Sequence, residues 1–207
     1  MRSLDALIAL GNLHRATPAP RAPAAWQLSE LAGRFVELSA LGVSASLTLA
    51  FGLVLDAQQQ GEPIAWVTPK QQSFYPPDAA EGGIDLDALA VVRVPNPRSA
   101  ARAADKLLRS GAFGLVILDL GADGDLPMPL QMRLAGLAQK YHTALVCLTE
   151  KAATLPSLGS LVAVRVHAAR RRIGPDRFVC ELRVLKDKRR GPTWTHQELC
   201  RGPAGLS

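Results

Sequence analysis

The segment from residue 40 to residue 47 has the position of a phosphate-binding loop but lacks its chemistry. It lies between a strand predicted over residues 35–39 and a helix predicted over residues 44–60, where a G-x-x-x-x-G-K-[ST] cradle would bind a nucleotide. Such a cradle needs two glycines for close backbone approach, a lysine for the phosphates and a hydroxyl for Mg²⁺. The window instead contains Ala40, Gly42, Ala45, Ser46 and Leu47. Because no lysine or arginine occurs from residue 35 to residue 69, we expect no nucleotide to bind here.

The other residue types give no catalytic or metal-binding pattern either. Asp119 ends an apolar stretch, as a Mg²⁺-binding carboxylate would, but without a phosphate cradle we expect it to cap a turn with Gly121. The four histidines have no spacing suited to a metal, and no serine or cysteine lies beside one in a triad-like motif. The sequence therefore predicts a protein that is not an enzyme, with no catalytic residue, metal or cofactor.

Length and composition predict one well-packed domain. The chain has 207 residues, of which 48% are hydrophobic and 20% charged, and this balance favours a folded interior over disorder. Its net charge of +6 suits a nucleic acid or an acidic protein as partner. No apolar run reaches the roughly 18 residues of a membrane span, and the first residues do not resemble a secretory signal. We therefore expect a soluble, cytoplasmic protein without membrane contact.

The first 25 residues are a predicted N-terminal arm and linker, and residues 26–207 are the predicted core domain. Four apolar residues, Leu4, Leu7, Ile8 and Leu10, have roughly helical spacing before Gly11. Three prolines between residues 18 and 23 then favour an extended tether. The four apolar residues are candidate contacts with another protein or a second copy of the chain, and packing against the chain's own core is the alternative.

The core is predicted to alternate strands with helices and to end in strands alone. Strands are expected over residues 35–39, 64–68, 115–119 and 143–148, and helices over residues 44–60, 97–110 and 130–141. Three more strands are expected over residues 161–168, 178–186 and 193–200. Continuous apolar strands are typical of a parallel sheet that is buried on both faces. We therefore predict an α/β fold with a mostly parallel, twisted sheet flanked by helices and a C-terminal antiparallel meander.

Basic residues gather towards the C-terminus. The candidate contacts for DNA or an acidic partner are Arg170, Arg171, Arg172, Lys186, Lys188, Arg189 and Arg190. We expect the two groups of arginine and lysine around residues 170–172 and 188–190 to lie in loops. Such a surface would attract a phosphate backbone without reading sequence. A solvated sheet edge is the alternative.

Phe74 and Tyr75 form a second candidate protein contact. Two prolines follow them, so we expect an extended segment here. Two adjacent aromatic residues of such a segment cannot both face inward, which leaves one of them for a partner.

Residues 26–205 resemble the RecA core fold, most strongly in residues 164–174, 181–188 and 202–205. Residues 65–69, 74–77, 83–92 and 99–118 resemble more narrowly the ImuA family, which comprises SulA-like relatives of RecA without an ATP site. This resemblance implies a RecA-like core without a working phosphate loop. It also implies a role beside ImuB, an inactive relative of Y-family polymerases, in DNA-damage-induced mutagenesis.

Two other positions and two loops depart from the RecA pattern. The catalytic carboxylate that should follow the strand over residues 64–68 is replaced by Pro69 and Lys70, and the nucleotide-sensing amide is replaced by Glu150. The two DNA-binding loops are reduced to residues 120–127 and 151–158. We therefore expect neither ATP hydrolysis nor strand exchange.

The leading hypothesis is a non-catalytic adaptor or regulator in SOS-induced translesion DNA synthesis. It would bind RecA, capping or inhibiting its filament, and an ImuB-type polymerase homologue, in the cytoplasm or at the nucleoid. The alternatives are a single-stranded DNA-binding module that uses the C-terminal basic strands, and a SulA-like inhibitor of cell division.

Overall fold

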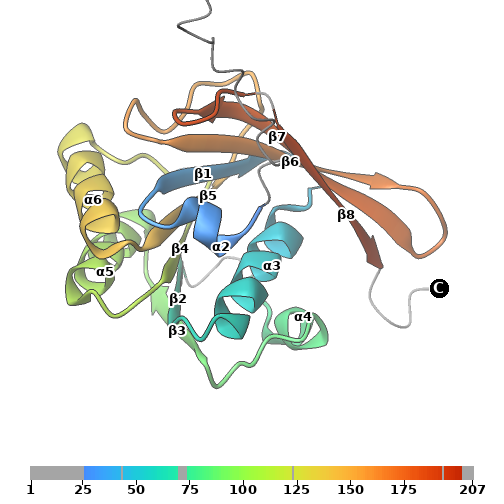
Figure 1. Cartoon of the computed structure of the whole chain (residues 1–207), viewed down its shortest axis with the longest axis horizontal. Helices are drawn as coiled ribbons and strands as arrows, with labels where there is room; N and C mark the ends of the chain where they lie inside the picture. The colour runs from blue at the N-terminus through green and yellow to red at the C-terminus, as the bar shows by residue number, and fades with distance from the viewer. Residues whose placement is uncertain (1–25, 43, 70–73, 123, 193, 202–207) are drawn as a thin grey trace, which may run out of the picture.

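One eight-stranded sheet organises the chain (Figure 1). The computed structural model describes residues 26–42, 44–69, 74–122, 124–192 and 194–201, so Leu4, Leu7, Ile8, Leu10, Lys70 and residues 202–207 lie outside the described part. The strands are β1 (Phe35–Ala40), β2 (Ile64–Pro69), β3 (Leu89–Val94), β4 (Leu115–Gly121), β5 (Ala144–Glu150), β6 (Val164–Arg172), β7 (Arg177–Asp187) and β8 (Thr195–Arg201). Their order in the sheet is β3-β2-β4-β5-β1-β6-β7-β8.

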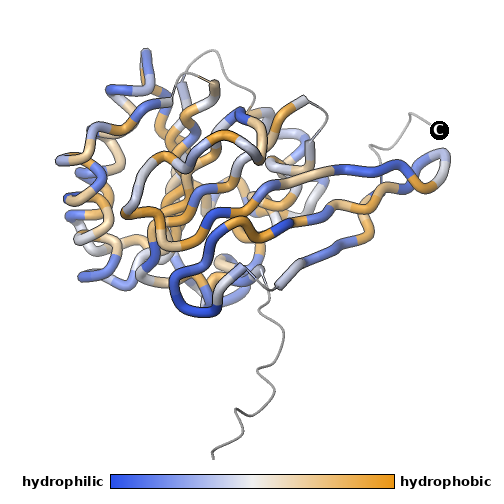
Figure 2. Tube along the Cα trace, turned by 90° about the horizontal axis from the view of Figure 1, so that it is seen from above, coloured by the Kyte–Doolittle hydropathy of each residue, from blue (hydrophilic) through white to orange (hydrophobic). Residues whose placement is uncertain are grey.

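The strands up to β6 pair in parallel, and the last three form an antiparallel meander. This confirms the predicted fold class. Because the carboxyl ends of β1, β4 and β5 meet at one edge of the parallel part, the segments that follow these strands are brought together there. β6 and β7 run out together from the body of the molecule as a long hairpin (Figure 2).

Helices cover both faces of the sheet (Figure 1). α5 (Pro97–Ser110) and α6 (Met128–Tyr141) lie on one face, and α2 (Leu28–Leu31), α3 (Ser46–Gln59) and α4 (Pro76–Glu81) lie on the other. Each layer encloses its own apolar cluster, since alternate residues of β1 point to opposite sides: Val36 and Leu38 join the α3 side, whereas Phe35 joins the α5–α6 side.

Local sequence signals explain the limits of α5. The Asn96 side chain accepts a hydrogen bond of 2.9 Å from the Ser99 N–H, and Pro97 occupies the first turn. The helix ends at Gly111, whose φ of 66° is left-handed and therefore favours glycine. The predicted limits of this helix, residues 97 and 110, are confirmed.

Several other expectations need correction. The helix predicted over residues 44–60 is shorter in the structure: α3 begins at Ser46, after Ala45 as its N-cap, and ends at Gln59. Pro76 and Pro77, expected to be extended, instead begin the short helix α4, because prolines are well tolerated in a first helical turn. β3, an edge strand in which exposed and buried residues mix, was not predicted. Arg170, Arg171 and Arg172 lie within β6 and not in a loop, because the strand continues four residues beyond its predicted end.

In the part of the chain that the structure describes, no helix is both long and apolar enough to cross a membrane.

Candidate functional site

A pocket of about 410 Å³ lies where the carboxyl ends of β1, β4 and β5 meet the start of α3. It is the position in which open α/β sheets bind ligands. Its lining contains most of the degenerate window together with the two acidic positions named above: Ala40, Gly42, Ser44, Ser46, Leu47, Asp119, Gly121, Leu148, Thr149 and Glu150. None of these lining residues is a lysine or arginine. The pocket thus keeps the place of a nucleotide site without a cation to hold phosphates.

A side chain stands beside this pocket where a phosphate-binding loop would have a glycine. Ala45 is fully buried, so its methyl group packs in the core at the position that the motif gives to its second glycine. Gly42 has a φ of 69° and supports the turn out of β1. Ser44 and Ser46 bond to each other, with 3.1 Å between their Oγ atoms. These hydroxyls are the only side-chain donors that the described window offers an anion.

Asp119 is held inside this pocket by its neighbours. Its side chain is buried, and the Thr68 hydroxyl donates a hydrogen bond of 3.1 Å to Oδ2. Burial raises the pKa of Asp119 above its ordinary value, and hydrogen bonds from Thr68 and the Gly121 backbone oppose the rise. The expected link to Gly121 is therefore present. Among the described residues, no group of three histidine, cysteine or acidic side chains is arranged to bind a metal ion.

A buried carboxylate that the sequence reading missed lies beside this pocket. Glu37, in the middle of β1, is completely buried, and its Oε1 lies 2.5 Å from Nζ of Lys151. The Thr149 hydroxyl donates to Oε1 at 3.2 Å, and the Leu158 N–H donates to Oε2 at 2.9 Å. A charge inside an otherwise apolar strand was the available signal, since such a charge requires partners. Two of these partners, Lys151 and Leu158, belong to the segment over residues 151–158, which the RecA resemblance equates with a DNA-binding loop.

Arg165 fixes the same segment from β6. It is buried, its Nε lies 3.7 Å from Oε2 of Glu37, and its guanidinium donates to the carbonyls of Leu155 and Ala152 at 2.5 and 3.3 Å. Lys151 also donates to the Pro156 carbonyl at 2.9 Å. Two cations and one carboxylate therefore hold the backbone of residues 151–158 against the sheet. The lysine and arginine are used inside the protein and are not presented to a phosphate backbone.

A second buried ion pair connects the antiparallel meander to the residue before β1. Asp187, at the end of β7, pairs with Arg34 at 2.5 Å and accepts a hydrogen bond of 3.0 Å from the Trp194 indole. Burial alone would raise the pKa of Asp187, but hydrogen bonds from the Arg189 N–H, Arg34 and Trp194, with the charge of Arg34, outweigh burial and lower it. The sequence offered no sign that Arg34 and Asp187, far apart along the chain, would meet.

The predicted basic surface divides into two groups. Arg170, Arg171 and Arg172 lie near the tip of the β6–β7 hairpin, where Figure 2 shows a hydrophilic stretch. Lys186, Lys188, Arg189 and Arg190 lie around the opposite end of β7, which at about 3.3 Å per residue is roughly 30 Å away. They are thus not one patch, because most of the length of β7 separates them.

Both basic groups contain side chains that contact neighbouring residues. Arg190 pairs with Glu30 at 2.8 Å, and Lys186 donates to the Ser160 carbonyl at 3.2 Å. At the tip, Arg170 stacks over the Phe178 ring at 4.8 Å, and Arg172 bonds to the carbonyls of Gly174 and Pro175. Arg171 is exposed and points to the opposite face of the hairpin from Arg170.

Of the two adjacent aromatic residues Phe74 and Tyr75, one is buried and one is exposed. Phe74 is buried and its ring lies 5.2 Å from that of Trp66, so it is a core residue and not an exposed protein contact. Tyr75 is 60% exposed and remains available at the surface.

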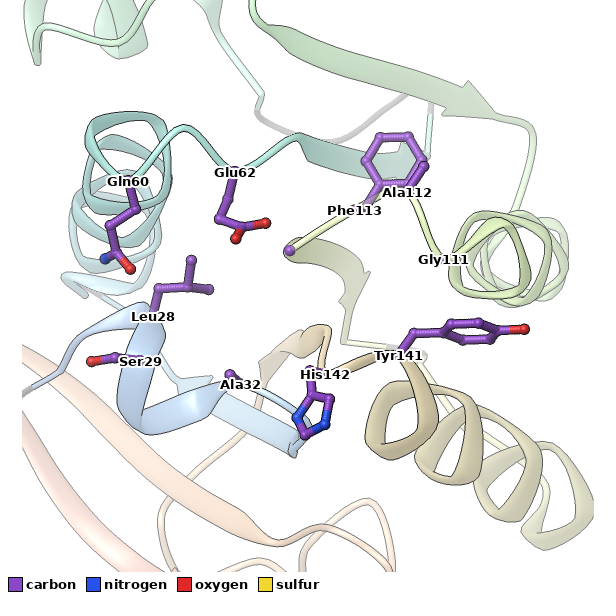
Figure 3. A pocket seen from close by; sticks show the side chains of 11 residues that line it. Leu28, Ser29, Ala32, Gln60, Glu62, Gly111, Ala112, Phe113, Tyr141 and His142 are labelled. Carbon is purple, nitrogen blue, oxygen red and sulfur yellow. The ribbon is translucent and has the colours of Figure 1, made fainter.

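A smaller pocket of about 210 Å³ lies at the opposite, amino ends of the parallel strands (Figure 3). Figure 3 shows Leu28 and Glu62 on one side of it and Tyr141 and His142 on the other. None of the predicted site residues lines this pocket.

Comparisons with known proteins agree with the architecture. No family model matches the chain. Similar proteins include the RecA protein of Fusobacterium nucleatum, 29% identical over 137 residues, which are 57% of this chain and 36% of that protein. The RecA protein of Bifidobacterium breve is 32% identical over 122 residues, 54% of this chain and 31% of that protein. The RecA protein of Kineococcus radiotolerans is 30% identical over 152 residues, 68% of this chain and 38% of that protein.

The chain therefore spans about a third of the length of the curated relatives it matches. The similarity supports a RecA-like fold for the core, in agreement with the sheet order and the helical layers.

Proposed function

We propose that this RecA-like chain is a non-catalytic adaptor or regulator in SOS-induced translesion DNA synthesis, as the ImuA resemblance implies. It would bind RecA and an ImuB-type polymerase homologue through its surface. One observation carries the proposal: the pocket at the ends of β1, β4 and β5 keeps its place, but the described residues that line it include two carboxylates and no cation. A site of this charge disfavours a triphosphate, so the RecA-like frame would serve binding and not turnover.

The segment over residues 151–158 supports the same proposal. A loop that follows DNA during strand exchange must be free to move and must present cations. Here Glu37 and Arg165 hold the segment, and Lys151 turns towards Glu37. As the structure describes it, this segment has neither the freedom to move nor the free cations of a DNA-binding loop. This supports a RecA-like fold that binds a RecA filament end and does not exchange strands.

Nucleotide binding is the first test. Titrating the full chain with ATP and Mg²⁺ in a calorimeter, with a RecA protein as positive control, should give no binding heat. Saturable ATP binding to the chain would overturn the non-catalytic part of the proposal.

Filament assays test the partner. Substoichiometric amounts of the full chain, added to RecA on single-stranded DNA, should change filament length or the rate of strand exchange. Deleting residues 1–16 should abolish this effect, if the arm carries the contact, while circular dichroism shows that the core stays folded. Full-length filaments and an unchanged rate, with no RecA recovered on the immobilised chain, would remove RecA as a partner. A pull-down with an ImuB-type protein tests the other partner independently.

Direct binding of single-stranded DNA is a second candidate function, favoured by the exposed arginines at the hairpin tip. It predicts an affinity that falls steeply with salt. Replacing Arg170, Arg171 and Arg172 by glutamine should abolish binding, whereas replacing Lys188 and Arg189, at the far end of β7, should have little effect. Equal losses from both sets of substitutions would argue against a site at the tip.

A further inference from the structure

A shallow groove of about 550 Å³ lies along α6 beside the end of α5, away from the pocket of about 410 Å³ and from the hairpin. These two helices lie side by side on one face of the sheet (Figure 1). The groove is lined by Arg109, Met132, Arg133, Gly136, Leu137, Lys140 and Tyr141. None of the residues predicted from the sequence to have a function lies in it.

The floor of this groove is apolar and includes a notch. Met132, Gly136 and Leu137 line the groove. Met128 lies one turn before Met132 on the same face of α6 and extends the apolar surface beyond the groove. Met132 is 61% exposed and Met128 is 47% exposed, which is unusual for two neighbouring apolar side chains of a soluble domain. A Cβ atom placed on Gly136 would meet no atom within 4 Å, so the missing side chain leaves open space beside the methionines.

The rim of the groove is cationic. Arg109 and Arg133 share a single carboxylate, that of Asp105, with their Nε atoms 3.2 and 2.6 Å from its oxygens. Because two guanidinium groups share one negative charge, the pair keeps a net positive charge. Lys140 lies with its ammonium 5.0 Å from the centre of the Tyr141 ring, at the end of the groove. The three cations thus surround the apolar floor with positive potential.

We propose that this groove binds an acidic amphipathic helix of a partner protein. The apolar residues of that helix would pack on Met128 and Met132 and enter the notch at Gly136, while its carboxylates would face the cationic rim. Methionine side chains adapt readily to an incoming apolar surface, and a groove between two helices has the shape that a third helix fills. The proposal does not depend on the nucleotide-pocket argument or on the SOS role.

Charge also excludes the nearest alternative occupant. The chain's own arm, residues 1–25, carries Arg2, Arg15 and Arg21 against the single acid Asp5, so it is positively charged as the rim is. An acidic segment is therefore favoured over the arm of the same or a second copy. Nucleic acid would match the cations but would leave the two methionines without apolar partners.

A pair of synthetic peptides provides the probe. One is an 18-residue helix with leucines at a three-to-four-residue spacing and glutamates beside them, and the other has lysines in place of the glutamates. Their binding to the full chain is measured by fluorescence anisotropy at fixed ionic strength. Met132→Glu places a negative charge in the groove that repels the glutamate peptide, and Gly136→Phe fills the notch. Gly136→Ala, which keeps most of the notch, and Leu199→Glu, at a residue 79% exposed on β8, are the matched controls.

The glutamate peptide should bind saturably and the lysine peptide at least about tenfold more weakly. Met132→Glu and Gly136→Phe should each weaken the glutamate peptide by about tenfold or more, while both controls bind it as the unmodified chain does. Equal binding of the two peptides, or binding that the groove variants do not change, would overturn the proposal. The proposal would also be overturned if the chain bound no peptide but bound DNA or a second copy of itself, and if Met132→Glu abolished that binding.

Discussion

Lys151 and Glu37 form a buried ion pair of 2.5 Å that joins the first strand of the sheet to the segment following β5. The Glu37 carboxylate is entirely buried, and the Lys151 side chain is only 17% exposed. A charged pair in this position must be complete, because either partner alone would leave an uncompensated charge in the interior. The conformation of residues 151–158 is therefore linked to the stability of the whole core.

Glu37→Gln should destabilise the protein by about 3–5 kcal/mol, since it leaves Lys151 and Arg165 without their shared carboxylate. Urea unfolding followed by circular dichroism measures the change. Glu150→Gln, which removes an exposed acid from the end of β5, is the control and should change stability by less than about 0.5 kcal/mol. Equal stabilities of the two variants would show that the pair does not hold the segment.

Asp187→Asn should lower stability at neutral pH, and the loss should shrink in acid. The native pKa of Asp187 is lowered, so the native carboxylate stays ionised at pH values where the unfolded chain already binds a proton. Its stabilising contribution is therefore complete above the ordinary aspartate pKa of about 3.9, and it disappears as the pH falls through the lowered native value. Unfolding free energies of both proteins from pH 7 to pH 2 should converge at the acid end. A constant difference would contradict the role of Asp187.

Asp119→Asn should have the opposite effect and stabilise the protein at pH 7. Burial raises the native pKa of Asp119, so the native state binds the proton more tightly than the unfolded chain does. Stability is therefore lost as the pH rises from the unfolded to the native pKa, and asparagine avoids this loss. Melting temperatures with and without Mg²⁺ measure it. A fall in melting temperature on substitution, or a large rise for the unmodified chain on adding Mg²⁺, would instead indicate a metal-binding carboxylate.

Cys200 should be the one thiol that reacts rapidly with a disulfide reagent at pH 8. It is half-buried, whereas Cys147 and Cys180 are buried. Burial and the contact with Cys200 raise the pKa of Cys180 to about 12, and burial followed by the charge of Glu37 raises that of Cys147 well above 9.0. Thiolate, the reactive form, is therefore scarce at both buried sites. The number of thiols that react in the fast phase checks this prediction. Cys200→Ser should remove the fast phase, and two fast thiols would show that Cys147 or Cys180 is not buried as described.

The sequence predicted the fold class because its signals were local. Pro97 and Gly111 mark both ends of α5, and the continuous apolar run of β4 requires a sheet covered on both faces. β3 was missed because an edge strand is only half-buried and carries Arg93 among its apolar residues.

The composition of the pocket could also be predicted, but the ionic contacts could not. The absent lysine is a property of one short window, and Ala40, Ser44 and Ser46 of this window line the pocket. Arg165 is buried against Glu37, and the sequence alone could not show this, because a contact over more than a hundred residues depends on strand register. The same holds for Arg34 and Asp187.

The carboxylate-lined pocket has a consequence for how such a chain would be controlled. A nucleotide-dependent protein leaves its partner when the bound nucleotide is hydrolysed, so it carries its own timer. If Asp119 and Glu150 keep a nucleotide out of this pocket, as proposed, the chain has no such timer. Under the proposed role, occupancy on a partner would follow mass action alone, and synthesis and degradation of the chain would set when it acts.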